Sequence, residues 1–328
     1  MFDWIQPELE AAGHSVVVRA AQSSEEVLDI ARDAEVVWDM GGVQTITAAI
    51  LPELSKCGAI IRGGSGTDNI PVREATELGI VVANTPDATA VAVPEHTAAL
   101  ILSFTRRVPM HDRGMAAGSW TPEEPLPILL KGKTVGLVGF GRIGRGVADR
   151  LRGFEVELLA YDPFPAGGDF AQHGARRCEL AELLGAADVV SLHTPLTDDT
   201  RHLIGAAELA RMKETAVLVN TSRGPVVDSQ ALLVALESGQ IAGAALDVFE
   251  SEPPDELAKR IVALPNVVAT PHTGGHSPNM LDTFCRLSVD TIHDLAAGRW
   301  PRSPTVRRSW SRTASNWKTS KGGSRHPV

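Results

Sequence analysis

Three ionisable residues, Arg223, Glu252 and His272, each follow a short apolar run in the C-terminal half of the chain. A planar guanidinium can bind a carboxylate through two parallel hydrogen bonds. An imidazole can donate or accept a proton near neutral pH, and a neighbouring carboxylate favours its charged form and fixes its orientation. Taken singly, each residue type is more often structural. In this order, the three indicate a site that binds an acid and protonates an oxygen that gains negative charge.

A glycine-rich segment, Gly139-Phe-Gly-Arg-Ile-Gly144, lies between an apolar run at 134–138 and a helical pattern at 147–151. The first glycine permits a tight turn, Gly141 permits close approach of a pyrophosphate, and Gly144 permits close packing of helix on strand. The N–H groups that begin the helix attract phosphates. The segment therefore predicts a dinucleotide site, with Arg142 and Ile143 beside the cofactor; the alternative is a structural turn without a ligand.

A second apolar run, 156–161, ends on Asp162, which lies 18 residues beyond Gly144. Its carboxylate would accept hydrogen bonds from both ribose hydroxyls and would repel a 2′-phosphate. Pro163 and Phe164 supply no adjacent cation for such a phosphate. The sequence therefore predicts NAD as the cofactor rather than NADP.

The elements that must position these residues are short β-branched runs alternating with amphipathic stretches, which indicates parallel sheets with helical crossovers. The runs expected as strands are 16–18, 36–38, 59–61, 80–82, 134–138, 156–161, 189–192, 216–219, 244–246 and 267–269. Helices are expected at 3–12, 24–32, 71–78 and from Pro94 to about Arg107, and 109–130 reads as a connector. The last six strands suffice for a complete dinucleotide-binding sheet. His96, at the start of its helix, is interpreted as structural.

The 328 residues are 43% hydrophobic and 22% charged, which indicates a globular protein of about two domains. The net charge of −9 is uneven, because eight Lys/Arg and no Asp/Glu lie between Arg299 and the end. The remaining body is strongly acidic, which argues against nucleic-acid binding as its main role. The basic stretch 306–328 has no periodic pattern, and we expect it to be disordered.

Neither a membrane partner nor a secretory leader is expected, because no apolar run reaches ~18 residues and the start carries acids without a basic region. Cys57, Cys178 and Cys285 are widely separated and show no metal-ligand spacing. A reducing, cytoplasmic location is therefore expected, and no metal site.

Four ordered motifs together resemble the D-isomer-specific 2-hydroxyacid dehydrogenase family, which includes phosphoglycerate dehydrogenases and glyoxylate/hydroxypyruvate reductases. They are the glycine segment with Asp162, 220–224 (NTSRG), 247–253 (DVFESEP) and 271–275 (PHTGG), and the resemblance covers about residues 8–300. It implies that Arg223 holds the substrate carboxylate and 2-oxygen, that His272 is the acid/base and that Glu252 pairs with it. Asp247 would contact the nicotinamide carboxamide. Further residues implied at the cofactor are His193, Thr194, Pro195, Thr221, Ser222 and Gly274, and those at the substrate are Arg62, Gly63, Gly64, Ser65 and Gly66.

The resemblance also implies an α/β fold of two doubly wound domains. A flavodoxin-like substrate domain would comprise residues 1–91 and 286–305, and a Rossmann NAD-binding domain residues 92–285. The implied function is hydride transfer between NAD(H) and C2 of a small D-2-hydroxy or 2-oxo acid, in a homodimer joined through the NAD domains. An NAD-regulated, co-repressor-like binding protein and an impaired NAD-binding protein stay open as alternatives. A formate dehydrogenase is disfavoured, since that branch has Gln where Glu252 stands.

Two features depart from the family pattern. The chain starts directly on the expected helix at 3–12, so we expect the strand that usually opens the substrate domain to be missing, through either a truncated start or a rearranged domain. Loss of a central strand would expose sheet edges and apolar surface. After Arg302 the basic stretch replaces the short segment of substrate domain that the family usually has.

Overall fold

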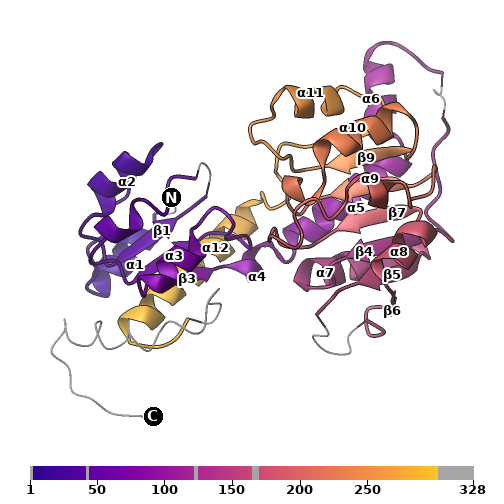
Figure 1. Cartoon of the computed structure of the whole chain (residues 1–328). Coiled ribbons are helices and arrows are strands. Elements are labelled where there is room, and N and C mark those ends of the chain that lie inside the picture. The colour runs from indigo at the N-terminus through magenta and orange to yellow at the C-terminus, as the bar shows by residue number, and fades with distance from the viewer. Residues whose placement is uncertain (1–2, 42–43, 122–124, 165–169, 302–328) are drawn as a thin grey trace. The chain divides into compact units, whose positions relative to one another are not determined.

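The computed structural model describes residues 3–41, 44–121, 125–164 and 170–301. These divide into two compact units, one comprising the residues up to Thr89 together with those from Ser277 onward, and the other Ala90–His276 (Figure 1). The boundary expected at 285/286 falls inside helix α12 (Pro278–Ala296), and the whole of this helix belongs to the first unit. The predicted stretch 306–328 lies outside the described residues.

The first unit contains a parallel three-stranded sheet in the order β1-β2-β3. Its other elements are helices, α12 among them. In chain order the elements before α12 are α1 (Ile5–Ala11), α2 (Ser24–Ala31), β1 (Val36–Asp39), η1 (Leu51–Glu53), β2 (Ala59–Arg62), α3 (Val72–Glu77), β3 (Val81–Asn84) and α4 (Pro86–Thr89).

Strand β2 is the centre of the first unit, because alternate side chains enter separate cores on its two faces. Ile60 packs with Val82 and residues of α2, α3 and η1 on one face. Ala59 and Ile61 pack with Val81 and with Leu295 of α12 on the other face. Helix α12 therefore completes the core of a unit whose three strands lie more than 190 positions earlier in the chain.

The expected helix at 3–12 is confirmed as α1, but the strand expected at 16–18 is wrong. Residues 15–21 form no regular element, and Val17 and Val18 are 62% and 51% exposed. A three-residue apolar run forms a strand only when a neighbouring strand pairs with it. Within the described residues β1 pairs with β2 alone, so β1 is an edge strand, and all four of its residues are half-buried.

The second unit is a seven-stranded parallel sheet in the order β10-β9-β8-β7-β4-β5-β6. The six strands expected from the sequence are confirmed. The helices that precede this sheet in the chain are α5 (Ala92–Thr105) and α6 (Val108–Ala116). The remaining elements are β4 (Thr134–Val138), α7 (Arg142–Leu151), η2 (Arg152–Phe154), β5 (Glu157–Tyr161), β6 (Ala175–Arg177), α8 (Leu180–Ala186), β7 (Val189–Leu192), α9 (Ala206–Leu209), β8 (Val217–Asn220), η3 (Gly224–Val226), α10 (Ser229–Glu237), β9 (Gly243–Leu246), α11 (Glu256–Val262) and β10 (Val267–Ala269).

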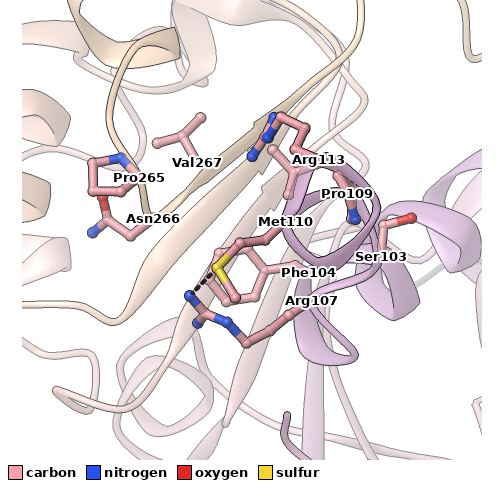
Figure 2. A pocket seen from close by; sticks show the side chains of 10 residues that line it. Ser103, Phe104, Arg107, Pro109, Met110, Arg113, Pro265, Asn266 and Val267 are labelled. Atoms are coloured by element: carbon pink, nitrogen blue, oxygen red, sulfur yellow. Dashed lines mark hydrogen bonds between the residues drawn. The ribbon is translucent and has the colours of Figure 1, made fainter. Parts of the chain in front are cut away.

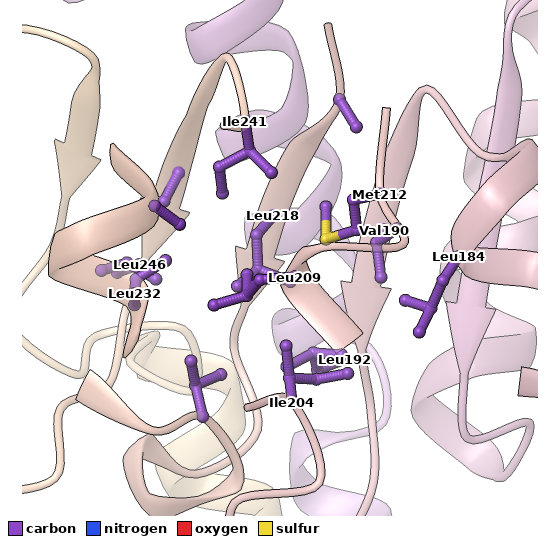
Figure 3. Packing of buried hydrophobic residues seen from close by; sticks show 14 of the residues in the cluster. Leu184, Val190, Leu192, Ile204, Leu209, Met212, Leu218, Leu232, Ile241 and Leu246 are labelled. Atoms are coloured by element: carbon purple, nitrogen blue, oxygen red, sulfur yellow. The ribbon is translucent and has the colours of Figure 1, made fainter. Parts of the chain in front are cut away.

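Both faces of the larger sheet are buried, as expected for parallel strands linked by helices. Helices α8 to α11 cover one face, where Leu192, Leu218 and Leu246 pack with Leu209 and Leu232 (Figure 3). Helices α5 and α7 cover the other face. The chain reverses its winding between the adjacent strands β4 and β7, and a sheet wound in this way binds ligands beyond the carboxyl ends of its strands at that point.

Candidate functional site

The glycine segment forms the turn between β4 and α7, and its three glycines meet different surroundings. Gly139 has φ +93°, and a β-carbon there would lie 2.8 Å from the backbone carbonyl of His193. A β-carbon on Gly144 would overlap the carbonyl oxygen of Gly139. Gly141, the N-cap of α7, has open space around its α-carbon. Gly139 and Gly144 are therefore required by the fold itself, whereas Gly141 leaves room for a ligand. Arg142 is exposed and Ile143 half-buried in the first turn of α7.

Asp162 follows β5 and is held by two backbone N–H groups. One oxygen accepts from Phe140 at 2.8 Å and the other from Phe164 at 2.9 Å. Since a carboxylate oxygen has two acceptor positions, each retains capacity for a ribose hydroxyl. The half-buried carboxylate is thus fixed beside the glycine turn, as the sequence predicts.

The loop after β7 contains buried polar atoms without partners among the described residues. They are both ring nitrogens of His193 and the hydroxyl of Thr194. Burial lowers the pKa of His193 to about 3, so its ring is neutral. A buried polar atom without a partner costs about 1–3 kcal/mol. With the glycine turn and Asp162, these atoms provide a site that fits a bound dinucleotide; Pro195 is exposed at the same loop.

Asn220, the last residue of β8, organises the turn that carries Arg223. Its side-chain oxygen accepts hydrogen bonds from the N–H and hydroxyl of Ser222, at 3.0 and 2.8 Å. Its side-chain amide donates to the carbonyl of Arg223 at 2.9 Å. The buried Thr221 shares a 2.8 Å hydrogen bond with Thr97 of α5, which ties the turn to that helix. Arg223 itself is half-buried, with one guanidinium nitrogen 2.8 Å from the carbonyl of Ser222.

His272 and Glu252 form a close pair. His272 Nδ1 lies 2.6 Å from one oxygen of Glu252, and the other oxygen accepts from the N–H of Phe249 at 3.0 Å. Burial alone would raise the pKa of Glu252, but these hydrogen bonds and the positive charges of His272 and Arg223 outweigh it and lower that pKa. His272 Nε2 has no hydrogen-bond partner in the described part of the chain, so this nitrogen can exchange a proton with a ligand.

Asp247 is 1% exposed and accepts several hydrogen bonds that fix the segment leading to His272. The donors are the hydroxyl of Thr270 at 2.5 Å and the N–H groups of Thr273 and Gly274 at 2.9 and 2.8 Å. His96 Nε2 also lies 3.3 Å away. Burial would raise the pKa of Asp247, but the hydrogen bonds from His96, Thr270 and the two N–H groups lower it. A β-carbon on Gly274 would meet Asp247 at 2.8 Å, so this glycine is required by packing.

The sequence did not identify His96 as part of this constellation. Its ring lies against the N-terminal part of α5, 3.0 Å from the hydroxyl of Thr270. The contact joins positions 174 residues apart, and no local motif could indicate it. All predicted catalytic and cofactor residues lie in the second unit, beyond the carboxyl ends of its strands.

The expected substrate loop, 62–66, lies in the first unit, directly after β2. Arg62 faces Asp39, 3.3 Å away, and donates to Asn69 at 3.0 Å. The N–H of Gly63 donates to the carbonyl of Asp39, and that of Gly64 to the hydroxyl of Thr85, both at 2.9 Å. The N–H groups of Ser65 and Gly66 make no hydrogen bond to any described residue. These two N–H groups are therefore the ones available to a ligand.

A separate pocket lies at the β10 edge of the larger sheet, near the start of that strand (Figure 2). It is lined by the C-terminal end of α5, by α6 and by residues 265–268, and it contains none of the predicted site residues. The guanidinium of Arg107 donates to the sulfur of Met110 there, at 3.0 Å. Within the described ranges there is no cluster of His, Cys, Asp and Glu that could hold a metal, and no helix there is long and apolar enough to span a membrane.

The sheet order, the glycine turn after β4 and the carboxylate after β5 define a dinucleotide-binding domain of the Rossmann type. Residues 98–274 match the family model described as D-isomer specific 2-hydroxyacid dehydrogenase, NAD binding domain. The chain belongs to the D-isomer-specific 2-hydroxyacid dehydrogenase family.

Similar proteins include enzymes with different named substrates. The chain is 39% identical to D-3-phosphoglycerate dehydrogenase of Methanocaldococcus jannaschii over 88% of this chain and 55% of that one. It is 41% identical to glyoxylate reductase of Thermococcus litoralis over 77% and 78% of the two chains. The structure of D-lactate dehydrogenase from Aquifex aeolicus, complexed with NAD and lactic acid, superposes with a TM-score of 0.83 at 26% identity, covering 93% and 97% of the two chains. The chain spans about half the length of the phosphoglycerate dehydrogenases it matches.

Proposed function

We propose that this protein is an NAD-dependent dehydrogenase that interconverts a small D-2-hydroxy acid and the matching 2-oxo acid. The observation that carries the proposal is the 2.6 Å pair of His272 and Glu252 beside Arg223. Family membership and the glycine turn with Asp162 support NAD as the cofactor. Relatives named phosphoglycerate dehydrogenase, glyoxylate reductase and D-lactate dehydrogenase support the substrate class and leave the particular acid open.

In the direction of reduction, the catalytic residues have distinct tasks. The glycine turn, Asp162 and the loop after β7 would hold the dinucleotide, which would supply the hydride for C2 of the 2-oxo acid. Arg223 binds the substrate carboxylate and stabilises the negative charge that develops on the 2-oxygen. His272 donates the proton from Nε2 to that oxygen, which completes the hydroxyl group. Glu252 accepts the hydrogen bond from Nδ1, so the ring keeps its orientation.

The cofactor and substrate residues beyond this pair stay predictions with defined tasks. Asp162 would accept hydrogen bonds from the adenosine ribose hydroxyls, and the N-terminus of α7 would meet the pyrophosphate. His193 and Thr194 would hydrogen-bond the cofactor through buried atoms that have no partner among the described residues. In the first unit, Ser65 and Gly66 would donate their N–H groups to the substrate carboxylate. Arg62 is already paired with Asp39, which supports a role in shaping that loop rather than in binding a ligand.

The decisive experiment follows NADH consumption by the purified protein with glyoxylate, hydroxypyruvate, pyruvate and 3-phosphohydroxypyruvate. We expect turnover on at least one acid, and its loss by about 10²-fold or more in His272→Ala with NADH affinity retained. His276→Ala is the matched control, since His276 is an exposed histidine four residues later. Tight NADH binding without turnover on any acid would instead favour a binding protein whose contacts NAD regulates.

We further propose a homodimer formed through the second unit. Large apolar side chains are exposed on α6 and in the chain after it, beside the pocket at Arg107. They are Val108, Met115, Trp120, Leu126 and Leu129, each at least 54% exposed. Large apolar side chains exposed in one part of the chain are typical of surfaces that mediate association. Light scattering after size exclusion should give twice the chain mass of 34.9 kDa, and Val108→Glu/Met115→Glu should give the monomer.

Three cysteines, Cys57, Cys178 and Cys285, are free and buried. Free cysteines are typical of proteins in a reducing compartment, and we propose that this protein is located in the cytoplasm. Fractionation of cells that express the tagged protein would test the location, and recovery with a secreted marker would contradict it.

A further inference from the structure

The structure places a positively charged side chain, that of Arg177, beside Asp162, although Arg177 lies 15 residues later in the sequence. Arg177 ends β6, the edge strand next to β5, and its guanidinium donates to the backbone carbonyl of Asp162 at 3.2 Å. The side chain is exposed, and it forms no ion pair with a carboxylate among the described residues. Its positive charge therefore lies at the residue whose carboxylate is expected to select the adenosine ribose.

An aromatic stack holds this guanidinium in place. The guanidinium carbon lies 5.7 Å from the ring centroid of Phe170, at a distance typical of cation–π contacts. Phe170 stacks on Phe140, with ring centroids 4.6 Å apart and planes 9° apart. Phe140 belongs to the glycine turn, and its N–H donates to the Asp162 carboxylate at 2.8 Å. Arg177, Phe170 and Phe140 thus form one continuous stack, and the backbone of Phe140 contacts the carboxylate.

The two opposite charges act differently on the two forms of the dinucleotide. A ribose with free hydroxyls donates to Asp162 and gains little from a nearby cation. A 2′-phosphate is repelled by Asp162, yet a guanidinium offers the planar, two-pronged donor that binds phosphate well. Because the carboxylate is fixed by two N–H groups while Arg177 is solvated, the carboxylate dominates in the unaltered protein.

We propose that Arg177 is a specificity-determining residue that already provides a 2′-phosphate subsite, and that Asp162 alone keeps this subsite closed to NADP. The inference rests on the dinucleotide site of the proposed function and deepens it. Removing the Asp162 carboxylate is then sufficient to admit NADP, with no need to introduce a new cation.

Binding tests this directly, because nicotinamide fluorescence reports NADH and NADPH affinity without turnover. The unaltered protein should bind NADH more tightly than NADPH. Asp162→Ser should tighten NADPH binding by about tenfold or more, as expected for one charge-assisted phosphate contact. Adding Arg177→Met should abolish that gain.

Arg176→Met in the Asp162→Ser background is the matched control. Arg176 is the preceding residue of the same strand, points to the opposite face and pairs with Glu182 at 2.8 Å. It should keep the gain in NADPH affinity. A gain that survives Arg177→Met, or no gain in NADPH affinity in a correctly folded Asp162→Ser variant, would overturn the role of Arg177. Failure of the unaltered protein to bind NADH would instead refute the dinucleotide site and this inference with it.

Discussion

His96 Nε2 lies 3.3 Å from Asp247 Oδ1, and this contact joins the N-terminal part of α5 to the segment that carries His272. The same nitrogen lies 3.0 Å from the hydroxyl of Thr270. The backbone N–H of His272 donates to the carbonyl of Asp247 at 2.8 Å. His272 has φ +52°, a conformation that an L-residue keeps only when its surroundings impose it. We infer that His96, through Asp247, positions His272, the residue that we propose as the acid/base.

Replacing His96 should therefore impair turnover without removing any group that contacts substrate. We expect His96→Ala to lower kcat by about tenfold with a smaller change in KM, because the orientation of His272 toward the 2-oxygen becomes less well defined. His96→Gln, which keeps a hydrogen-bond donor, should recover part of the loss. Equal kcat values in His96→Ala and the unaltered protein would show that the contact serves folding alone.

A substitution at Gly141 should affect cofactor binding without affecting folding. A β-carbon there meets no atom within 4 Å, so Gly141→Ala should fold normally yet weaken NADH binding by about tenfold or more, since the pyrophosphate must approach its backbone. Gly139→Ala, at φ +93°, should also lower the melting temperature. Fluorescence titration and thermal unfolding measure the two effects. Gly153→Ala, equally open but outside the turn, is the control for affinity, and unchanged NADH binding in Gly141→Ala would refute the assigned phosphate site.

Glu252→Gln removes the charge beside His272 and keeps a hydrogen-bonding side chain. We expect kcat/KM for reduction to fall by about 10²-fold, because the proton-donating form of His272 loses its partner charge. Glu250→Gln is a close control: Glu250 also pairs with a histidine, His202, at 2.6 Å, and it lies only two residues away. Steady-state kinetics at equal folded fractions should show near-normal rates for Glu250→Gln; comparable losses in both variants would mean that the segment, and not the catalytic pair, is affected.

His193 should make stability depend on pH in the range where histidines titrate. Its pKa is lowered from 6.5 to about 3 by burial, so below pH 6.5 the unfolded chain binds a proton that the folded chain does not. Its contribution is present above pH 6.5 and is lost as the pH falls from there. From about pH 7.5 to about pH 5.5, the free energy of unfolding should fall by about 1.4 kcal/mol more than in His193→Gln. Urea unfolding without NADH measures this difference, and parallel pH profiles would contradict it.

Much of the second unit could be predicted from the sequence, because buried parallel strands appear as continuous apolar runs, and each run here is followed by a recognisable polar motif. Strand β6 was missed since two of its three residues are exposed arginines, which match no strand pattern. The strand expected at 16–18 was wrong because pairing, which the local sequence does not specify, decides whether a short apolar run becomes a strand.

The site was predictable where a motif carries it and not where distant segments meet. Glu252 and His272 lie in recognisable motifs, and their predicted pairing matches the 2.6 Å contact. The contacts of His96 with Asp247 and of Arg177 with Asp162 depend on tertiary packing, so no spacing rule indicates them. His96 adds a ring nitrogen beside the Asp247 carboxylate, and Arg177 adds a guanidinium at the backbone carbonyl of Asp162.

The chain leaves the first unit after Thr89 and returns to it at Ser277, and this has a consequence for biogenesis. The second unit is one uninterrupted stretch, so it can fold while the ribosome still synthesises α12. The first unit must wait, because Phe284, Cys285 and Val289 of α12 pack against Ile5 and Leu9, which are synthesised much earlier. Until α12 emerges, those apolar side chains stay uncovered, and uncovered apolar surface of this kind on a nascent chain favours aggregation and chaperone binding.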